Sequence, residues 1–533
     1  MQIIVAKPFA FDNLSYALDN CANTTQHFAK HSAVRRKLPS VARPNWFVLF
    51  KMKKTFFIIL ALLAFCFAVR LVVALNTRVI SSDGPSYLSA ARDFASGDYH
   101  AGLAKQAFHP LYPFLIAVFS KFIHNWEWAG MLVSIILSSL AIIPLFFISR
   151  RYLPLSVTII ACLLYCFHPH GVQLSSSIFT TGTFVGILFY ALWVTTIALE
   201  KNNHIYFMLS GLLSFVMYLV RPDGVVFFIL TLVMILITPL TSGKGKVVRI
   251  LYLSIPWLLM LIPFLIAIKS ASGIVGITGK VSIKTVTEME IEKSFSGLYQ
   301  FILDFIKGAN PVPFIFFLTG AVLYFRTKFV SFRKIYFVWF IFVGFIVVFT
   351  VFAVTHGRTS KRYTVPLFLM VLPWSASGLS YLVEKINTRW VSYLLIAIVI
   401  IGLSFFTFKP LGKDKLIEKN TGQVLREYHS AKGMPAKKPL IITMLSRVAY
   451  YADGKEIVPE ELLLDLIDYH KLTGTIIGKN IDYLVWDDRL IRKFPCLEQE
   501  LMAYLKDRND LFIEEITPQT SSGSVFYKIY RFR

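Results

Sequence analysis

The chain has 533 residues, of which 56% are hydrophobic, 15% aromatic and 16% charged, and its mean hydropathy is +0.61. Soluble proteins carry about 25% charged residues on average, so this composition excludes an ordinary soluble enzyme. The formal net charge of +24 would suggest nucleic acid as the partner of a soluble protein. Here much of that charge lies in short loops between apolar segments, where it sets membrane orientation, so nucleic acid is not a predicted partner.

Residues 1–51 differ from the rest because they contain no apolar run long enough to cross a bilayer. Lys51-Met52-Lys53-Lys54 then leads directly into an apolar run that begins at Thr55, a pattern typical of a basic segment before a signal or anchor helix. Two interpretations stay open: Met52 is the biological start, or residues 1–51 form a cytoplasmic N-terminal arm. No small-residue cleavage site follows, so the run is predicted to remain as the first helix.

Residues 52–408 contain about eleven apolar runs near the length that crosses a bilayer. If the N-terminus is cytoplasmic, every inner loop carries Lys or Arg, as the positive-inside rule requires. We therefore expect a polytopic α-helical membrane protein whose long loops 76–127 and 269–310 lie on the outer side. The predicted spans are Thr55–Leu75, Trp128–Ile148, Leu155–Phe167, Phe179–Leu199, Ile205–Val220, Val225–Thr238, Ile250–Ile268, Pro311–Phe325, Ile335–Val354, Tyr363–Val383 and Val391–Phe408.

The long outer loops contain shorter helical patterns. Apolar residues recur at helical spacing from Tyr87 to Ala95, which predicts a short helix in the membrane interface. The apolar stretch Leu111–Ile123 is too short for a span, so we expect a re-entrant or interfacial segment. Residues 298–306 repeat the amphipathic pattern in the second loop.

Residues 409–533 have the composition of a small soluble α/β domain, predicted to lie outside the cytoplasm. Asp453-Gly454 marks a tight turn within it. The predicted strands are Leu440–Met444, Tyr483–Trp486, Leu511–Ile516 and Val525–Tyr530, and the predicted helices are Glu460–Tyr469 and Glu498–Lys506.

Asp83 is the first candidate for chemistry, because it follows the first span within Ser81-Ser82-Asp83-Gly84-Pro85. A carboxylate at the outer membrane surface is suited to take a proton from an acceptor hydroxyl. The alternative is structural, since Asp before Gly-Pro is also a good helix N-cap. The sequence leaves the two interpretations equal.

Arg221-Pro222-Asp223-Gly224 forms a very short outer turn between two spans. The positive-inside rule disfavours an arginine in an outer turn, so the position of Arg221 requires an explanation. An ion pair with Asp223 or another carboxylate is one reason, and an anionic ligand is the other.

A second outer loop, residues 356–363, places Arg358, Lys361 and Arg362 directly before the next span. Three cations against the orientation rule favour a phosphate ligand, because guanidinium groups bind phosphate oxygens with two parallel hydrogen bonds. A solvated turn that contacts lipid headgroups is the alternative.

Taken in chain order, these motifs resemble a known superfamily. Asp83 after the first span, His109-Pro110-Leu111-Tyr112-Pro113, Arg221-Pro222-Asp223 and Arg362-Tyr363 before Val365-Pro366 occur in the order seen in the GT-C membrane glycosyltransferases. The chain looks like the branch that contains the protein O-mannosyltransferases and the lipid A aminoarabinose transferases. The resemblance covers roughly residues 52–408.

The resemblance implies an inverting transfer of a sugar from a polyprenyl-phosphate carrier to a lipid, glycan or protein acceptor on the outer face of a membrane. In that family the aspartate of the first loop is the essential acidic residue, which carries over to Asp83 as the catalytic residue. A carrier phosphate is a good leaving group when its charge is neutralised, so its expected partners are Arg221, Arg358, Lys361 and Arg362. The further residues expected to line the site are His109, Tyr112, Asp223 and Tyr363. The implied location is the bacterial inner membrane, with membrane lipids as further partners.

Two departures from the family pattern leave fewer carboxylates than usual. Many members have a second acidic residue where this chain has Gly84, and a Thr-Glu-Pro-like stretch where it reads Thr180-Thr181-Gly182. A non-catalytic GT-C-like subunit therefore stays open as an alternative function. A transporter or flippase of an amphipathic anionic lipid is the other, although it predicts an internal duplication that we do not find.

The sequence shows no paired-cysteine metal site and no glycine-rich nucleotide loop. No cofactor is predicted, and no cluster of ligands supports a divalent metal.

Overall fold

The computed structural model describes the chain from residue 46 onwards, with several gaps. The described ranges are 46–105, 109–238, 243–273, 291–327, 336–357, 359–386, 388–432, 438–457, 469–506, 512–516 and 527–532.

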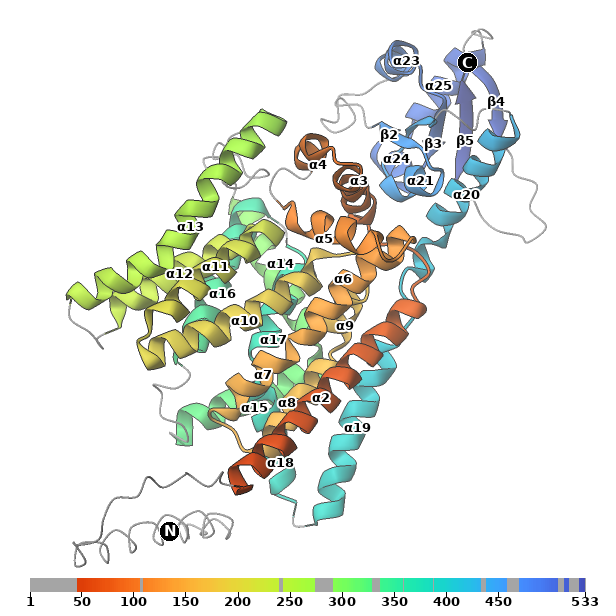
Figure 1. Cartoon of the computed structure of the whole chain (residues 1–533). Coiled ribbons are helices and arrows are strands. Elements are labelled where there is room, and N and C mark those ends of the chain that lie inside the picture. The colour runs from red at the N-terminus through yellow and green to blue at the C-terminus, as the bar shows by residue number, and fades with distance from the viewer. Residues whose placement is uncertain are drawn as a thin grey trace, which may run out of the picture. The chain divides into compact units, whose positions relative to one another are not determined.

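The described part up to residue 407 is helical, and its helices pack side by side (Figure 1). These helices are α2 (Trp46–Leu75), α3 (Gly84–Ala95), α4 (Tyr99–Lys105), α5 (Leu111–Ser120), α6 (Trp126–Leu140), α7 (Ile142–Arg150), α8 (Leu155–Cys166), α9 (Pro169–Ser175), α10 (Thr180–Lys201), α11 (His204–Val220), α12 (Asp223–Ile237), α13 (Gly243–Ser272), α14 (Ile291–Ala309), α15 (Pro311–Thr327), α16 (Tyr336–His356), α17 (Lys361–Met370), α18 (Leu372–Glu384) and α19 (Arg389–Thr407).

Among the described residues, six helices are long and apolar enough to cross a membrane, and up to nine spans result if each bent helix pair counts as one. α11 and α12 are shorter apolar helices. Each of the eleven predicted spans lies on one of these helices or helix pairs. The predicted class, a polytopic helical membrane protein with a small C-terminal α/β part, is confirmed.

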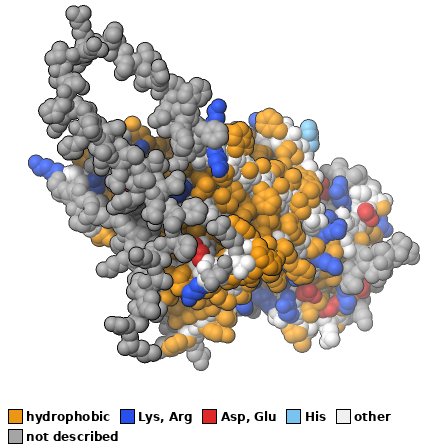
Figure 2. Space-filling view, turned by 90° about the horizontal axis from the view of Figure 1, so that it is seen from below, with side chains coloured by type: hydrophobic (Ala, Val, Ile, Leu, Met, Phe, Trp, Pro, Cys, Tyr) orange, Lys and Arg blue, Asp and Glu red, His pale blue; other side chains and the backbone are white. Residues whose placement is uncertain are grey.

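Apolar side chains on the outside of the bundle agree with a membrane environment. Phe405 on α19 is 82% exposed and Leu259 on α13 is 70% exposed, values that would be costly in water for side chains of this size. Figure 2 shows a broad hydrophobic surface on one face of the molecule.

Three helix pairs bend sharply at their junctions. The angle is 55° between α8 and α9, 59° between α17 and α18, and 97° between α14 and α15. α9 and α15 both begin with proline, which lacks a backbone N–H and therefore starts a helix well but cannot continue one. Asn310, at the sharpest bend, has a φ of 63°.

Small residues let some helices approach closely. A side chain on Gly320 of α15 would strike the carbonyl of Trp374, and one on Gly378 of α18 would strike the carbonyl of Phe316. The two glycines thus allow backbone contact between α15 and α18, as small residues do in membrane helix pairs.

The C-terminal α/β region begins after α19 and contains one five-stranded sheet in the order β2-β1-β3-β5-β4. β1 pairs in parallel with β2 and β3, whereas β5 is antiparallel to β3 and β4. Its elements are η3 (Lys413–Lys415), α20 (Leu416–Ala431), β1 (Leu440–Ile442), α21 (Ser446–Tyr451), β2 (Lys455–Ile457), α23 (Tyr469–Gly478), β3 (Tyr483–Trp486), α24 (Asp488–Lys493), α25 (Leu497–Lys506), β4 (Phe512–Ile516) and β5 (Lys528–Phe532).

Helices cover both faces of this sheet because alternate strand residues point to opposite sides. Ile441, Tyr483 and Val485 pack with side chains of α20 and α21. Ile442 and Leu484 pack on the other face with side chains of α23 and α25. This arrangement places α21, which follows β1, against α3 of the helical part.

The predicted strands and the predicted helix Glu498–Lys506 are found within a few residues, whereas β2 and the helices α20, α21, α23 and α24 were not predicted. The first strand is shorter than predicted and the last begins three residues later, while β2 follows the predicted turn at Asp453-Gly454 and was not expected. The predicted helix Glu460–Tyr469 lies almost wholly outside the described residues.

Candidate active site

Asp83 occupies the N-cap position of α3, yet its carboxylate makes no capping hydrogen bond. Ser82 Oγ donates a hydrogen bond to Asp83 Oδ1 over 3.2 Å. The other oxygen, Oδ2, accepts from Arg362 Nη1 in a short ion pair. The side chain of Asp83 is therefore turned toward α17 rather than used as a helix cap.

A second ion pair lies close to the first and differs from it in burial. Arg221 Nη2 lies 2.6 Å from Asp223 Oδ2, and the two side chains are only 7% and 10% exposed. Arg362 and Asp83 are 36% and 34% exposed. A buried pair that loses one partner leaves an uncompensated charge, whereas a partly exposed pair exchanges partners at low cost. The Arg221–Asp223 pair is thus shielded from solvent, whereas the Asp83–Arg362 pair is partly open to it.

The turn between α11 and α12 fixes the buried pair. Arg221 ends α11 in an extended conformation, and Asp223 begins α12 two residues later. A side chain at Gly224 would strike the backbone nitrogen of Tyr218, so glycine permits the turn to close.

Arg221 also reaches the backbone of the other pair. Its Nη1 donates to Thr181 Oγ1 over 3.3 Å and to the carbonyl oxygen of Arg362 over 3.2 Å. The guanidinium carbons of Arg221 and Arg362 lie 4.9 Å and 5.6 Å from the centre of the Tyr363 ring. Tyr363 thus contacts both cations, and Arg221 holds the beginning of α17 in place.

The structure brings Asp83, Arg221, Asp223, Arg362 and Tyr363 into one cluster, although they come from three separate parts of the chain. Lys361 is the half-buried first residue of α17, beside Arg362. Within the described residues, no carboxylate forms an ion pair with its ammonium group. Arg358, the third predicted cation of this loop, lies outside the described residues.

His109 and Tyr112 lie at the start of α5, and neither takes part in the two ion pairs of the cluster. His109 is half-buried directly before this helix. Tyr112 is fully buried, and its hydroxyl bonds the Gly130 carbonyl over 3.0 Å and Ser134 Oγ over 2.9 Å. Its ring packs edge-on against Tyr87, with centres 5.2 Å apart. Tyr112 therefore supports the site through Tyr87.

Tyr87 belongs to the site and was not singled out from the sequence. Burial raises the pKa of its hydroxyl, and the negative charge of Asp83 adds to the rise. A hydrogen bond with Thr180 and the charges of Arg221 and Arg362 act in the opposite direction. The sequence spacing could have pointed to Tyr87, because it lies one helical turn after Asp83 and such residues are neighbours on a helix.

Asp304 is a second residue that sequence reasoning missed. It is 5% exposed on α14, where its Oδ2 accepts from Thr359 Oγ1 over 2.6 Å and its Oδ1 from Gln300 over 3.1 Å. Its backbone carbonyl accepts from Thr364 Oγ1 over 2.9 Å. Asp304 thus ties α14 to the loop and first turn that carry Lys361 and Arg362.

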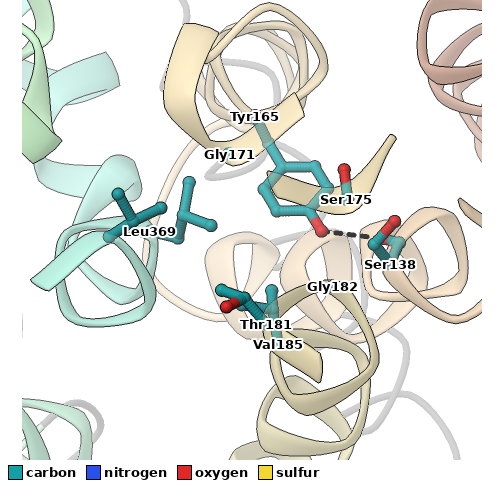
Figure 3. A pocket seen from close by; sticks show the side chains of 9 residues that line it. Ser138, Tyr165, Gly171, Ser175, Thr181, Gly182, Val185 and Leu369 are labelled. Atoms are coloured by element: carbon teal, nitrogen blue, oxygen red, sulfur yellow. Dashed lines mark hydrogen bonds between the residues drawn. The ribbon is translucent and has the colours of Figure 1, made fainter. Parts of the chain in front are cut away.

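A small, mostly apolar cavity lies among α6, α8, α9, α10 and α17 (Figure 3). Ser138, Tyr165, Ser175 and Thr181 are among its lining residues, and its volume of about 10 Å³ is room for about one water molecule. It touches the site through Thr181, the partner of Arg221, but it is far too small for a sugar phosphate.

Arg70 of α2 is buried on another side of Ser138. Its Nε donates to Ser138 Oγ over 3.1 Å, its Nη1 contacts Cys66 Sγ at 2.8 Å, and its guanidinium lies 4.7 Å from the Tyr165 ring centre. These contacts let a charged side chain stay inside the helical bundle.

No group of three or more His, Cys, Asp or Glu side chains suited to a metal ion occurs in the described parts of the chain.

Comparisons with known proteins agree with this architecture. Residues 105–268 match the family model described as dolichyl-phosphate-mannose-protein mannosyltransferase. No curated protein sequence matches the chain.

Solved structures match over most of the chain at low sequence identity. The structure of ArnT from Cupriavidus metallidurans bound to undecaprenyl phosphate is 14% identical, with a TM-score of 0.59 over 92% of this chain and 98% of that one. The oligosaccharyltransferase of Archaeoglobus fulgidus in the apo form is 11% identical, with a TM-score of 0.54 over 89% and 74%. AglB from the same organism, in complex with an inhibitory peptide and a dolichol-phosphate, is 12% identical, with a TM-score of 0.50 over 88% and 74%.

At these identities the structural likeness shows the fold, and the family model adds a sequence match within it. The predicted resemblance is therefore confirmed: the chain has the fold of the GT-C membrane glycosyltransferases, and residues 105–268 match a mannosyltransferase family of that superfamily.

Proposed function

We propose that this protein transfers a sugar, with inversion, from a polyprenyl-phosphate carrier to a hydroxyl group of a lipid, glycan or protein acceptor. We place the reaction on the outer side of a bacterial inner membrane. The matched family model names a dolichyl-phosphate-mannose donor, and two similar structures contain undecaprenyl phosphate and dolichol-phosphate. These likenesses support a lipid-phosphate donor.

The observation that carries the proposal is the partly exposed pair of Asp83 and Arg362. A glycosyl transfer of this kind needs a carboxylate to accept the acceptor proton and a cation to neutralise the leaving phosphate. The pair supplies one of each at a single place, next to Lys361, whose ammonium group has no carboxylate partner among the described residues.

In the proposed step the acceptor oxygen attacks the anomeric carbon from the face opposite the phosphate. Asp83 takes the hydroxyl proton while the bond between the anomeric carbon and the phosphate oxygen breaks. The carrier phosphate leaves with the electron pair, and Arg362 and Lys361 balance its charge. A phosphate that binds Arg362 also replaces Asp83 as its partner, which frees the carboxylate to act as a base.

The other predicted residues take supporting roles in this proposal. Arg221 holds the backbone of Arg362 and contributes positive charge, and Asp223 keeps Arg221 in position. Tyr363 contacts both guanidinium groups. His109 and Arg358 are proposed to line the donor site from neighbouring loops.

The test is a transfer assay with purified protein in nanodiscs and a panel of short-chain polyprenyl-phosphate sugars, each offered with and without lipid and glycan acceptors. We expect one donor to be consumed and free carrier phosphate to be released in wild type. Absence of binding to every polyprenyl-phosphate sugar would contradict the proposal.

Two observations support the non-catalytic alternative: the chain has Gly84 where many family members have a second acidic residue, and the candidate base is ion-paired. A non-catalytic subunit would bind a polyprenyl-phosphate sugar without turning it over. The same assay therefore separates the two functions when donor binding is measured alongside release.

A further inference from the structure

The segment that leads into Asp83 is held by the C-terminal α/β region. Residues 78–82 are the second part of the connection between α2 and Asp83, and α21 of the C-terminal region packs against α3. Five hydrogen bonds join this segment to the C-terminal region: Arg78 N donates to the Leu411 carbonyl over 2.9 Å, Lys419 Nζ to the Arg78 carbonyl over 3.1 Å, Ile80 N to Tyr451 Oη over 3.1 Å, Arg447 Nη1 to the Ile80 carbonyl over 3.5 Å, and Ser446 Oγ to the Ser82 carbonyl over 3.2 Å. From the helical part, the Ile178 carbonyl accepts from Ser81 Oγ over 2.6 Å.

Arg447 contacts the segment from a position that is itself fixed within the C-terminal region. Its Nε and Nη2 donate to the two carboxylate oxygens of Glu418 over 2.6 Å and 2.7 Å. The two residues are 8% and 2% exposed, so this is a buried pair with two parallel hydrogen bonds. The pair joins α20 to α21, and the Nη1 of Arg447 is directed at the carbonyl of Ile80.

Tyr451 adds a second fixed point on the same helix. Its hydroxyl accepts from the amide of Ile80, and the ammonium of Lys419 lies 5.4 Å from its ring centre. A side chain at Gly422 of α20 would strike the Cβ of Tyr451, so α20 and α21 meet closely here. Side chains of α21 therefore bind both the backbone N–H and the backbone carbonyl of Ile80.

The orientation of Asp83 depends on this backbone. Its carboxylate makes no bond to the amides of α3, so no capping contact orients the side chain, while its backbone carbonyl accepts from Tyr87 N over 3.2 Å. The carboxylate is held by Arg362 and Ser82, and the backbone from which its side chain extends is the one that enters through residues 78–82.

We propose that the C-terminal α/β region positions the candidate base of the transfer reaction, and that Arg447, held by Glu418, is the positioning residue. The proposal rests on the proposed function, since it gives Asp83 its role as base. Arg447 touches neither donor nor acceptor in this account. It acts through the backbone of Ile80, and so through the place of the Asp83 carboxylate.

Misplacement of a reacting group by about 1 Å costs about 100-fold in rate. We therefore expect Arg447→Ala to lower kcat by about 10- to 100-fold while KM for the donor changes less than about threefold. Arg447→Lys should recover only part of the loss, because an ammonium cannot form the two parallel bonds to Glu418. Glu418→Gln, a milder change, should give a smaller loss of the same kind.

A double-mutant comparison distinguishes positioning from general damage to the fold. If Arg447 acts through Asp83, then Arg447→Ala should cost nothing further in kcat once Asp83→Asn is present, because coupled residues are not additive. Full additivity would overturn the proposal. Glu498→Gln is the matched control, since it weakens the Lys528–Glu498 pair at 2.9 Å, which lies away from residues 78–82, and it should leave kcat unchanged.

Hydrogen–deuterium exchange tests the same proposal without any activity. In wild type the amides of Arg78 and Ile80 are bonded to the C-terminal region and should exchange slowly. Arg447→Ala should speed exchange at residues 78–82 at least tenfold, with unchanged exchange at β3 showing that the sheet is intact. Unchanged exchange at 78–82 in both Arg447→Ala and Glu418→Gln would refute the positioning role, even if the protein proves to transfer no sugar.

Discussion

Arg362 at the start of α17 is ion-paired with Asp83, which lies 279 residues earlier in the chain. Both side chains remain about one third exposed, and Arg221 holds the carbonyl of Arg362 from a neighbouring helix. A phosphate arriving at Arg362 competes with the Asp83 carboxylate for the same guanidinium. The contact therefore links donor binding to release of the candidate base.

Replacing Arg362 by Ala should weaken binding of a polyprenyl-phosphate sugar by about 10- to 150-fold, because a charged hydrogen bond contributes about 1.5–3 kcal/mol. Arg362→Lys should recover part of the affinity, since it restores the charge but not the planar fork. Binding is measured by titration in nanodiscs. Arg492→Ala, which removes an exposed arginine of α24, is the control, and equal affinities in all three variants would return Arg362 to a purely structural role.

Asp223→Asn should destabilise the protein, because it leaves the buried guanidinium of Arg221 without its counter-charge. Breaking a buried pair in this way costs about 3–5 kcal/mol, whereas a partly exposed pair such as Asp83–Arg362 contributes up to about 1 kcal/mol. Thermal unfolding of Asp223→Asn and Asp83→Asn in one detergent compares the two. Equal melting temperatures, with donor binding lost in Asp223→Asn, would instead make Arg221 a phosphate ligand.

The helical architecture could be predicted because apolar length and loop charge are local properties. Each predicted span lies on a helix, and the Arg221–Asp223 pair was already one of two alternatives because its members are two residues apart. The contact between Asp83 and Arg362 could not be predicted from spacing, since it depends on how α3 and α17 pack.

Asp304 and β2 were not predicted from the sequence, and each has a physical reason. Asp304 lies in an amphipathic helix, where a lone acidic residue looks like part of the solvated face, and burial against Thr359 is visible only in the fold. β2 is three residues long and contains Lys455 and Glu456, so it lacks the apolar alternation that marks a strand. It forms because β1 offers it a parallel edge.

The C-terminal region should be more stable at mildly acidic than at alkaline pH. Burial raises the pKa of Glu456 from 4.5 to about 7; Arg489 opposes this rise and Asp487 adds to it. The folded state thus binds the proton more tightly, so the stabilisation is complete below pH 4.5 and is lost as the pH rises through about 7. The melting temperature, compared at pH 5.5 and 8, measures this loss of stability and should be higher at pH 5.5.

Glu456→Gln should reduce this pH dependence, because the amide does not titrate. Glu500→Gln, on the exposed side of α25, should keep the wild-type dependence. The same temperature difference in wild type and Glu456→Gln would show that another group is responsible.

The predicted orientation places Gly412 outside the cytoplasm and Gly243 inside. Alkaline phosphatase, which folds only in an oxidising compartment, should be active when fused after Gly412 and inactive after Gly243. A green fluorescent protein fusion at each site should report the reverse. Cytoplasmic signals at both positions would invert the loop assignment and move Asp83 away from the outer surface.

The most direct test of the central claim is sugar transfer by purified Asp83→Asn and wild type at equal folded concentration, with donor binding measured in the same preparations. Asparagine keeps the size of the side chain but cannot accept the acceptor proton, so turnover should fall by about 10²- to 10⁴-fold. Donor affinity should be retained or improved, because Arg362 loses the carboxylate that competes with phosphate. Near-normal turnover in Asp83→Asn would contradict the assignment of Asp83 as the catalytic base.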